Sequence, residues 1–449
     1  MLELNKIYNK DCLEGLKELD DNSVDLICTD PPYGYNFRGK DWDKGTPKQE
    51  IWDECLRVLK AGAFAFVMSA PRQDVQSEMI VKLTRAGFKT KFTPLYWACA
   101  TGFPKAANIG KLVDKRLGAE REVVGKYKSP EGTCADTPRD NPNPMSLGDR
   151  DRQGLADVTS PSTPEAKALD GSYAGFNPKP AVEIILVAMK PLSEKTYVDQ
   201  ALANGKGVTW LDDCRIPYES EDDAEKHQFN MDGAKRGDVL RSENLYGGYE
   251  PLQNTQQNQD GRFPANLLVS DDVLNNGNDS KGSHTQELNS KDMNNNVYGK
   301  YAQRADIPAC NDSGSFSRYF SLDAWAKKNM PCYPFLIVPK ASKGEKNEGC
   351  NMPIDNSDKY NGKFPSTKVD KLKNVHPTCK PVALMSYLIT LGSQEKDLIL
   401  DPFIGSGTTA IAARTLSRSF IGFELSPEYH KIAEARIKTH LEQKRLWEI

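Results

Sequence analysis

Residues 398–409 read Leu-Ile-Leu-Asp-Pro-Phe-Ile-Gly-Ser-Gly-Thr-Thr. The apolar start of this segment predicts a buried strand. The turn Gly405-Ser406-Gly407 leads into a helix predicted over residues 408–416. In an open α/β sheet, a glycine-rich turn at the carboxyl end of a strand lets the backbone approach a ligand closely. A phosphate-binding loop is the alternative, but the Gly-Lys-Ser/Thr ending that grips nucleotide phosphates is missing. A ligand with a positive sulfonium and an amino-acid group fits this loop better.

A second motif, Asp30-Pro31-Pro32-Tyr33, follows the apolar run 24–29. The Asp30 carboxylate and the Pro31 carbonyl can each accept one hydrogen of an aromatic amine and draw its nitrogen toward tetrahedral geometry. Pro32 fixes the turn, and Tyr33 offers a flat face on which a base rotated out of the duplex can stack. Read alone, the tetrad is also compatible with a plain β-turn. Together with the glycine-rich turn it predicts methylation of an exocyclic amine.

Two further carboxylates are candidates for ligand binding. Glu424 ends the strand predicted over residues 420–423, where a carboxylate can accept hydrogen bonds from a ribose diol. Its alternative role is a capping or surface residue. Asp11 ends the extended segment 7–10 and can accept from an adenine amine, or it can cap the helix that starts at Leu13.

The order of the predicted elements indicates an α/β fold whose core is split in sequence. Strands and helices alternate over about the first hundred residues, return at a strand over residues 181–189, and resume after residue 335. One doubly wound, mostly parallel Rossmann-like sheet with large insertions explains this pattern better than three separate domains. We divide the chain into a catalytic part (1–102), an insertion (103–180), a core strand (181–190), a target recognition region (191–334) and a cofactor-binding part (335–449).

Composition narrows the class of protein. The ten cysteines and five histidines lack the close spacing of metal ligands, so we expect no metal site. No apolar run approaches the roughly 20 residues needed to cross a bilayer, and the first residues do not resemble a signal peptide, so we expect a cytoplasmic protein.

The formal net charge of −3 does not exclude a nucleic-acid partner, because an enzyme needs only a basic face. A basic stretch follows residue 103, and residues 109–117 within it predict a helix. The residues that we expect to contact DNA are Lys105, Lys111, Lys115 and Arg116. A solvated helix face is the alternative.

These motifs resemble those of the S-adenosylmethionine-dependent amino-methyltransferases of DNA. Asp30 to Tyr33 is similar to their catalytic tetrad, residues 401–409 to their methionine-binding loop, and residues 376–381, His-Pro-Thr-Cys-Lys-Pro, to an element that precedes that loop. A catalytic motif ahead of the cofactor loop is typical of the circularly permuted beta group, which has a seven-stranded sheet with the target recognition region between the motifs. The resemblance implies that S-adenosylmethionine is bound by Asp11, Asp30, His376, Thr378, Lys380, Asp401, Phe403, Gly405, Ser406, Gly407, Thr408, Thr409 and Glu424.

In this family a leading Asp, as in Asp30, favours the N6 amine of adenine, whereas Ser marks cytosine N4 enzymes. The resemblance therefore implies an adenine methyltransferase acting on double-stranded DNA. The alternatives are a cytosine N4 enzyme and a non-catalytic DNA-binding homologue. Residues 101–105, Thr-Gly-Phe-Pro-Lys, and 261–266 resemble phage and prophage enzymes more loosely. Two settings fit, a methylase with a cognate restriction endonuclease as partner and a solitary phage enzyme, and the sequence leaves the oligomeric state open.

Overall fold

The computed structural model describes residues 2–34, 43–98, 106–128, 155–176, 181–218, 261–270, 280–281, 313–315, 317, 320–330, 343–347, 350, 374, 376 and 378–447. Contacts divide the chain into two compact units. The first combines residues 1–101 with 181–449, and the second consists of residues 102–180.

The first unit is built on a twisted, mostly parallel sheet. Its strands are β1 (Lys6–Tyr8), β2 (Val24–Thr29), β3 (Leu59–Ser69), β4 (Leu95–Ala98), β7 (Val182–Met189), β8 (Leu267–Val269), β11 (Leu398–Asp401) and β12 (Ser419–Phe423). They lie in the order β1-β12-β11-β2-β3-β7-β4-β8. Neighbouring strands are parallel except at β7, which runs antiparallel to both β3 and β4. The mostly parallel α/β sheet is confirmed, but the described strands number eight rather than the seven expected. The additional strand β8 comes from the segment 191–334 and pairs with the edge of β4.

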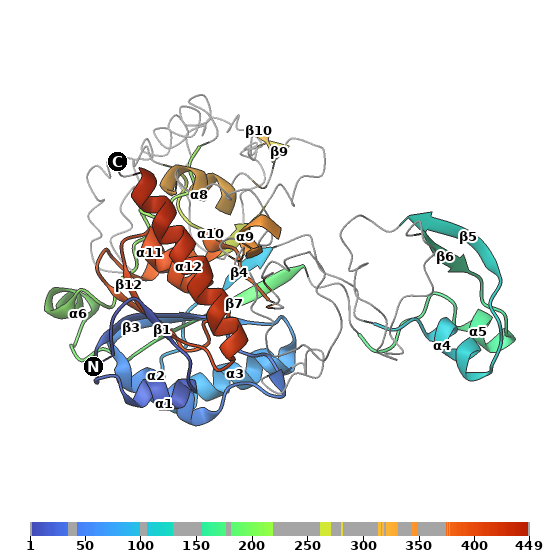
Figure 1. Ribbon diagram of the computed structural model, residues 1–449, viewed down its shortest axis with the longest axis horizontal. Coiled ribbons are helices and arrows are strands. Elements are labelled where there is room, and N and C mark those ends of the chain that lie inside the picture. Colours follow the sequence, from blue (N-terminus) through green and yellow to red (C-terminus); the bar gives the residue numbers. More distant parts are fainter. Residues whose placement is uncertain are drawn as a thin grey trace, which may run out of the picture. The chain divides into compact units, whose positions relative to one another are not determined.

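Helices cover both faces of this sheet, so the fold is doubly wound (Figure 1). The described helices of the first unit are α1 (Cys12–Lys17), α2 (Gln49–Val58), α3 (Gln73–Ala86), α6 (Tyr197–Asn204), α8 (Leu322–Asn329), α9 (Lys343–Asn347), α10 (Val382–Gly392), α11 (Thr408–Thr415) and α12 (Pro427–Trp447). Side chains of β3 alternate between the two layers: Phe64 and Phe66 pack with α10 and α11, whereas Ala65 and Val67 pack with α1 to α3. A separate two-stranded sheet pairs β9 (Ser280–Lys281) with β10 (Ser313–Gly314).

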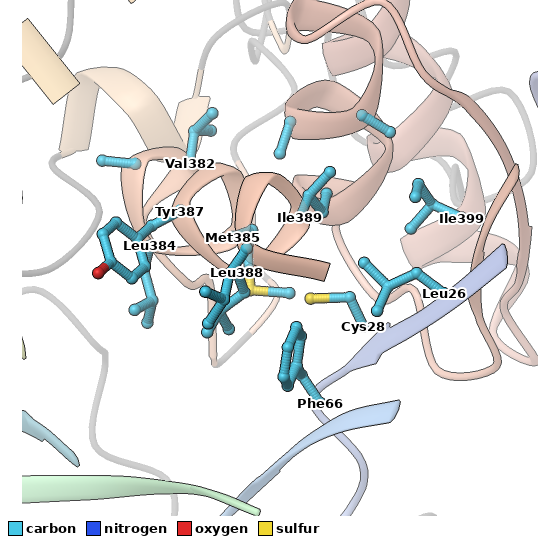
Figure 2. Close-up of a cluster of buried hydrophobic side chains, with 14 of the residues drawn as sticks. Leu26, Cys28, Phe66, Val382, Leu384, Met385, Tyr387, Leu388, Ile389 and Ile399 are labelled. Atoms are coloured by element: carbon cyan, nitrogen blue, oxygen red, sulfur yellow. The ribbon is translucent and has the colours of Figure 1, made fainter. Parts of the chain in front are cut away.

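Helix α10 forms the centre of one layer. Every residue from Val382 to Gly392 is buried, as expected for a helix that is apolar on all sides. Figure 2 shows Met385 and Leu388 of this helix facing Cys28 and Phe66 of the sheet. This packing fixes α10, and with it the segment 378–381 that precedes the helix, against the strands that carry the site.

Helix α2 and strand β3 follow each other directly, because α2 ends at Val58 and β3 begins at Leu59. Gly62 lies inside β3 with a positive φ of 77°, beside a shift of register between β2 and β3. Glycine is suited both to a helix end and to a bulge, so the local sequence does not distinguish the two.

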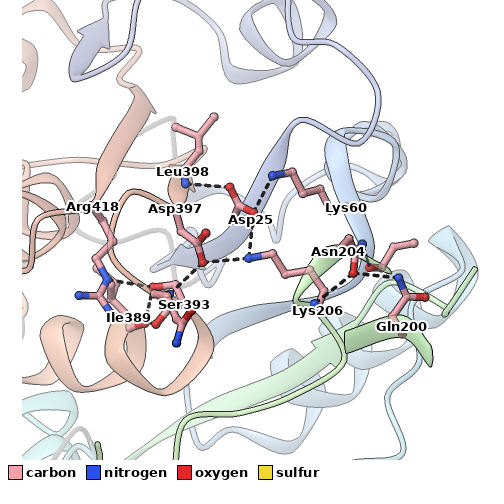
Figure 3. A network of polar contacts seen from close by, with 12 residues as sticks. Asp25, Lys60, Gln200, Asn204, Lys206, Ile389, Ser393, Asp397, Leu398 and Arg418 are labelled. Carbon is pink, nitrogen blue, oxygen red and sulfur yellow. Dashed lines mark hydrogen bonds and ion pairs between the residues drawn. The ribbon is translucent and has the colours of Figure 1, made fainter. Parts of the chain in front are cut away.

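A buried polar network fastens the amino-terminal edge of the sheet (Figure 3). Asp25 of β2 accepts a hydrogen bond from the backbone nitrogen of Leu398 at 2.9 Å and from Lys60 Nζ at 2.7 Å. Lys206 Nζ lies 2.8 Å from both Asp25 and Asp397. Strands β2, β3 and β11 are thereby joined where they begin, at the edge of the sheet opposite to their carboxyl ends.

The second unit contains α4 (Ile109–Arg116), β5 (Val123–Lys128), β6 (Leu155–Thr159) and α5 (Pro164–Ala168), with β5 and β6 paired antiparallel. At its centre lies Asp114, fully buried, which accepts hydrogen bonds from Arg121 Nη1 and from both the backbone nitrogen and the hydroxyl of Thr163. The sequence analysis assigned residues 103–180 to an insertion. Its short elements β6 and α5 left no strong apolar period in the sequence, and hydrogen bonds to Asp114 stabilise the segment that joins them.

Candidate active site

The candidate site lies where three neighbouring parallel strands end. Strand β2 leads into Asp30, β11 ends at Asp401, and β12 leads into Glu424. Because β12, β11 and β2 are adjacent and parallel, their carboxyl ends meet at one edge. A cavity of about 770 Å³ opens there, and ligand pockets typically measure about 300–1,000 Å³.

The cavity brings together most of the predicted site residues. All four residues of the tetrad Asp30 to Tyr33 line it. The predicted cofactor residues that line it are Asp11, Asp30, His376, Thr378, Lys380, Asp401, Phe403, Gly405, Ser406, Thr408, Thr409 and Glu424. Gly407, the remaining predicted cofactor residue, is the N-cap of α11 and is not among the lining residues.

Asp401 organises the loop between β11 and α11. Its carboxylate accepts hydrogen bonds from Thr29 Oγ1 and Thr409 Oγ1, both at 2.6 Å, and from the backbone nitrogen of Phe403 at 3.0 Å. Burial raises the pKa of Asp401 to about 6, although these hydrogen bonds act in the opposite direction. Asp401 therefore connects β2, the loop and α11.

Two glycines bring the loop backbone close to its neighbours. Gly405 and Gly407 have φ of 52° and 82°, a region that other residues rarely adopt. A Cβ atom on Gly405 would lie 2.8 Å from His376 Nε2, and one on Gly407 would lie 3.1 Å from the Cβ of Ala433. The loop backbone therefore packs closely against His376 and against Ala433 of α12.

His376 forms the opposite side of this contact. Its Nδ1 lies 2.8 Å from the carbonyl oxygen of Thr378, and its ring packs edge to face on Tyr429 at 4.5 Å. Burial lowers the pKa of His376 to about 4, so the ring is neutral near pH 7. A neutral ring held in this way shapes the pocket and adds no charge to it.

Arg436 is a site residue that sequence reasoning missed. It is fully buried on α12 and donates from Nη1 to the carbonyl oxygen of Ser406 at 2.5 Å, to Ser406 Oγ at 3.2 Å and to Thr408 Oγ1 at 3.3 Å. Its Nη2 donates to the carbonyl oxygen of Glu345 at 3.3 Å. The available signal was an arginine that interrupts the apolar stripe of Ala433 and Ile437. Arg436 holds the glycine-rich loop from behind.

Glu424 and Asp11 lie on the side of the cavity formed by β12 and α1. Glu424 Oε1 accepts from the backbone nitrogen of Ser426 at 2.8 Å, and burial raises the pKa of its carboxyl to about 7. Asp11 caps α1 by accepting from the backbone nitrogen of Leu13 at 2.8 Å. Asp11 therefore has the capping role that the sequence allowed, and it also faces the cavity.

The tetrad forms a tight polar cluster. Tyr33 donates its hydroxyl hydrogen to Asp30 Oδ1 at 2.6 Å, and Lys380 Nζ donates to Asp30 Oδ2 at 2.6 Å. The Lys380 ammonium also lies 5.6 Å from the centre of the Tyr33 ring. The sequence placed Lys380 among the cofactor residues, whereas in the structure it donates a hydrogen bond to the carboxylate of the tetrad.

A second residue missed by the sequence is Asp43, which holds the exit of the tetrad. Its Oδ1 accepts from the backbone nitrogens of Tyr33 at 3.0 Å and Gly34 at 2.9 Å, and the side chain is buried. A carboxylate that accepts two successive backbone hydrogens fixes a turn in one conformation. Asp43 could not be recognised from a sequence pattern, because its partners are backbone atoms ten and nine residues away.

The predicted DNA-contacting residues Lys111, Lys115 and Arg116 lie on α4 of the second unit and are exposed. Lys105 lies outside the described residues. Within the described ranges, no group of three or more His, Cys, Asp or Glu side chains is placed to hold a metal ion. In the same part of the chain, no helix is long and apolar enough to cross a membrane.

The sheet and the site define a Rossmann-like α/β protein in which a glycine-rich loop and the Asp30 carboxylate line one cavity. The model of a family described as DNA methylase matches residues 24–435, and the chain belongs to this family.

Named methyltransferases match part of this chain. The chain is similar to the type II methyltransferase M2.DpnII of Streptococcus pneumoniae, with 42% identity over 133 residues, which are 28% of this chain and 46% of the relative. It is also similar to M2.LlaDCHI of Lactococcus lactis subsp. cremoris, with 37% identity over 124 residues, 27% of this chain and 44% of the relative. The chain thus spans less than half the length of these relatives.

Among solved structures, an M1.HpyAVI-SAM complex aligns over 96% of this chain and 98% of its own, with 15% identity and a TM-score of 0.36. The cytosine-N4-specific PvuII DNA methyltransferase aligns over 98% and 91%, with 14% identity and a TM-score of 0.38.

Proposed function

We propose that the protein is a DNA methyltransferase that transfers a methyl group from S-adenosylmethionine to the N6 amine of adenine in double-stranded DNA. The observation that supports it best is the single cavity that contains both the glycine-rich loop and the Asp30 carboxylate. Membership of the DNA methylase family supports DNA as the substrate. The leading Asp30 favours adenine over cytosine.

The cavity suits S-adenosylmethionine. The backbone at Gly405, which lines the cavity, and the polar wall of His376 and Thr378 would receive its amino-acid part, and Glu424 would accept hydrogen bonds from its ribose. When bound, the cofactor supplies an electrophilic methyl group on a positively charged sulfur.

Asp30 acts on the target amine in this proposal. An exocyclic amine is a poor nucleophile because its lone pair is delocalised into the ring. Asp30 and the Pro31 carbonyl each accept a hydrogen bond from one N–H group of the amine, so that the nitrogen lone pair is directed toward the methyl donor. Because Asp30 Oδ1 accepts from Tyr33 in this structure, the Tyr33 hydroxyl must release that oxygen when the base arrives. The released ring can then stack on the base.

The test is chemical identification of the product. DNA from cells that express the protein is digested and its nucleosides are analysed by mass spectrometry, and sequencing that detects modified bases gives the target. N6-methyladenine at a defined site is the expected result. A product of N4-methylcytosine alone would contradict the adenine assignment, and unmodified DNA would contradict the enzymatic one.

We predict that cofactor affinity rises with pH through the titration of Glu424. The ionised carboxylate accepts hydrogen bonds from a ribose better than the neutral acid, so binding favours the ionised form. With a pKa of about 7 in the free protein, affinity should rise roughly tenfold from pH 6 to pH 8 and then level off. Calorimetry in buffers of different ionisation enthalpy should show proton release on binding near pH 6.5.

Glu424→Gln is the control for this pH dependence, since glutamine keeps an acceptor oxygen and does not titrate. Asp401, whose pKa is about 6, remains in that variant and would account for any residual slope. The stability of the free protein depends on pH in the opposite direction to cofactor affinity. The raised pKa of Glu424 means that its contribution to stability is full below its ordinary 4.5 and is lost as pH rises through about 7. An unchanged pH dependence in Glu424→Gln would show that Glu424 does not bind the cofactor.

We further propose that the second unit contacts DNA through α4 and that segment 191–334 contributes to target recognition. Replacing both Lys111 and Lys115 by alanine should weaken binding to a DNA duplex and reduce the slope of log affinity against log salt by about 1 to 2, because each neutralised phosphate releases counterions. Fluorescence anisotropy between about 50 and 200 mM salt measures this.

Lys17→Ala, an exposed lysine on α1, is the control. If the double variant binds with the same affinity and slope as the unmodified protein, α4 is a solvated helix face with no role in DNA binding.

A further inference from the structure

A second carboxylate shares the lysine that holds Asp30. Lys380 Nζ lies 2.6 Å from Asp30 Oδ2 and 3.1 Å from Glu183 Oε2. Lys380 is only 9% exposed. Burial alone would lower the pKa of Lys380, but the charges of Asp30 and Glu183 together raise it above its ordinary value. The ammonium is therefore positively charged and lies between two negative groups.

The reversed direction of β7 brings Glu183 to this place. The other central strands reach the site at their ends, whereas β7 runs antiparallel to β3 and β4 and reaches it at its start. Ile184 pairs with Ser69, the last residue of β3, so the preceding Glu183 lies at the edge where β2 leads into Asp30. If β7 ran parallel to its neighbours, Glu183, the second residue of the strand, would lie at the opposite edge of the sheet.

We propose that Glu183 is a positioning residue for methyl transfer, acting on the Asp30 carboxylate through Lys380. The proposal rests on the function proposed above, and it adds a residue that lies outside both sequence motifs. Glu183 is not among the residues lining the cavity, so its effect is exerted through Lys380 and not on the ligand.

The need for a second carboxylate follows from the hydrogen bonds of Asp30. Both of its oxygens are occupied, Oδ1 by the Tyr33 hydroxyl and Oδ2 by Lys380. To bind Asp30, the target amine must displace one of these two partners. The carboxylate oxygen that it then contacts must be a strong hydrogen-bond acceptor. With Glu183 present, the positive charge of Lys380 is shared, so the three side chains keep a net negative charge available to the amine. Without Glu183, Lys380 would neutralise Asp30 alone and weaken it as an acceptor.

The first experiment compares Glu183→Gln with Glu54→Gln. Glu54 is a matched control because its side chain is 22% exposed, against 23% for Glu183, and it pairs with Arg57 on the outer helix α2. Single-turnover methylation of the duplex that the unmodified protein modifies should slow roughly tenfold in Glu183→Gln, while calorimetry shows the same cofactor Kd. Glu183→Asp should recover part of the rate, and Glu54→Gln should retain all of it. An unchanged rate in Glu183→Gln, or a loss explained by weaker cofactor binding, would overturn the proposal.

A double-mutant cycle with Lys380→Met tests the route of the effect. If Glu183 acts only through Lys380, adding Glu183→Gln to Lys380→Met should cause no further loss of rate. Independent, multiplying losses would show that Glu183 acts by another route and would contradict the proposal.

A chemical measurement separates failure of this inference from failure of the proposed function. If the unmodified protein methylates no DNA, the proposed function fails, but the role of Glu183 can still be read from the reactivity of Lys380. Removing one negative neighbour should make Lys380 react faster with an amine-acylating reagent, as followed by mass spectrometry of the Lys380 peptide. Equal reactivity in Glu183→Gln and in the unmodified protein would refute the coupling between the two residues.

Discussion

Replacing Asp30 by alanine is expected to abolish methyl transfer and to leave cofactor affinity nearly unchanged. The carboxylate is the group that meets the target amine, so its loss removes an interaction that is strongest in the transition state. Removal of one such preorganised group slows catalysis by roughly a hundredfold to a thousandfold in other enzymes. Transfer is measured in single turnovers with labelled cofactor, and affinity by calorimetry.

Two variants sharpen this experiment. Asp30→Asn keeps an acceptor oxygen but loses the charge, and it should retain more activity than Asp30→Ala if hydrogen bonding contributes alongside charge. Asp53→Ala removes an exposed carboxylate on α2 and should behave as the unmodified protein. Methyl transfer at the normal rate in Asp30→Ala would refute the assignment of the catalytic residue.

Replacing Arg436 by methionine is expected to impair cofactor binding and stability together. Arg436 donates to two residues of the glycine-rich loop and to the carbonyl oxygen of Glu345, all in a buried setting. Hydrogen bonds that involve a charged group each contribute about 1.5–3 kcal/mol. We therefore expect a loss of roughly 3 kcal/mol in unfolding free energy and at least a tenfold rise in cofactor Kd.

Affinity in this variant is measured well below its melting temperature, so that only folded protein is titrated. Arg436→Lys keeps the charge but lacks the planar fork, and it should recover little of the affinity. Arg85→Met, an exposed arginine on α3, should change neither quantity. A stability loss with unchanged affinity would show that Arg436 supports the fold but not the loop.

The sequence alone identified the elements on which the site is built. An apolar run followed by glycines predicted a strand, a turn and a helix at residues 398–409, because side-chain burial and positive φ are local requirements. The same reasoning applied at Asp30 to Tyr33, where two prolines restrict the backbone. In the structure these two motifs line one cavity, since the ends of adjacent parallel strands meet.

Tertiary structure decided the rest, for a physical reason that recurs at each missed residue. Arg436, Asp43 and Glu183 act through atoms of residues distant in sequence or through backbone groups, and such contacts leave no periodic pattern. The direction of β7 also depended on how the sheet was completed, because a strand sequence reads alike whether it runs parallel or antiparallel. Thus the sequence determined the two motifs, with their turns and strands, while packing alone decided that Lys380 lies between Asp30 and Glu183.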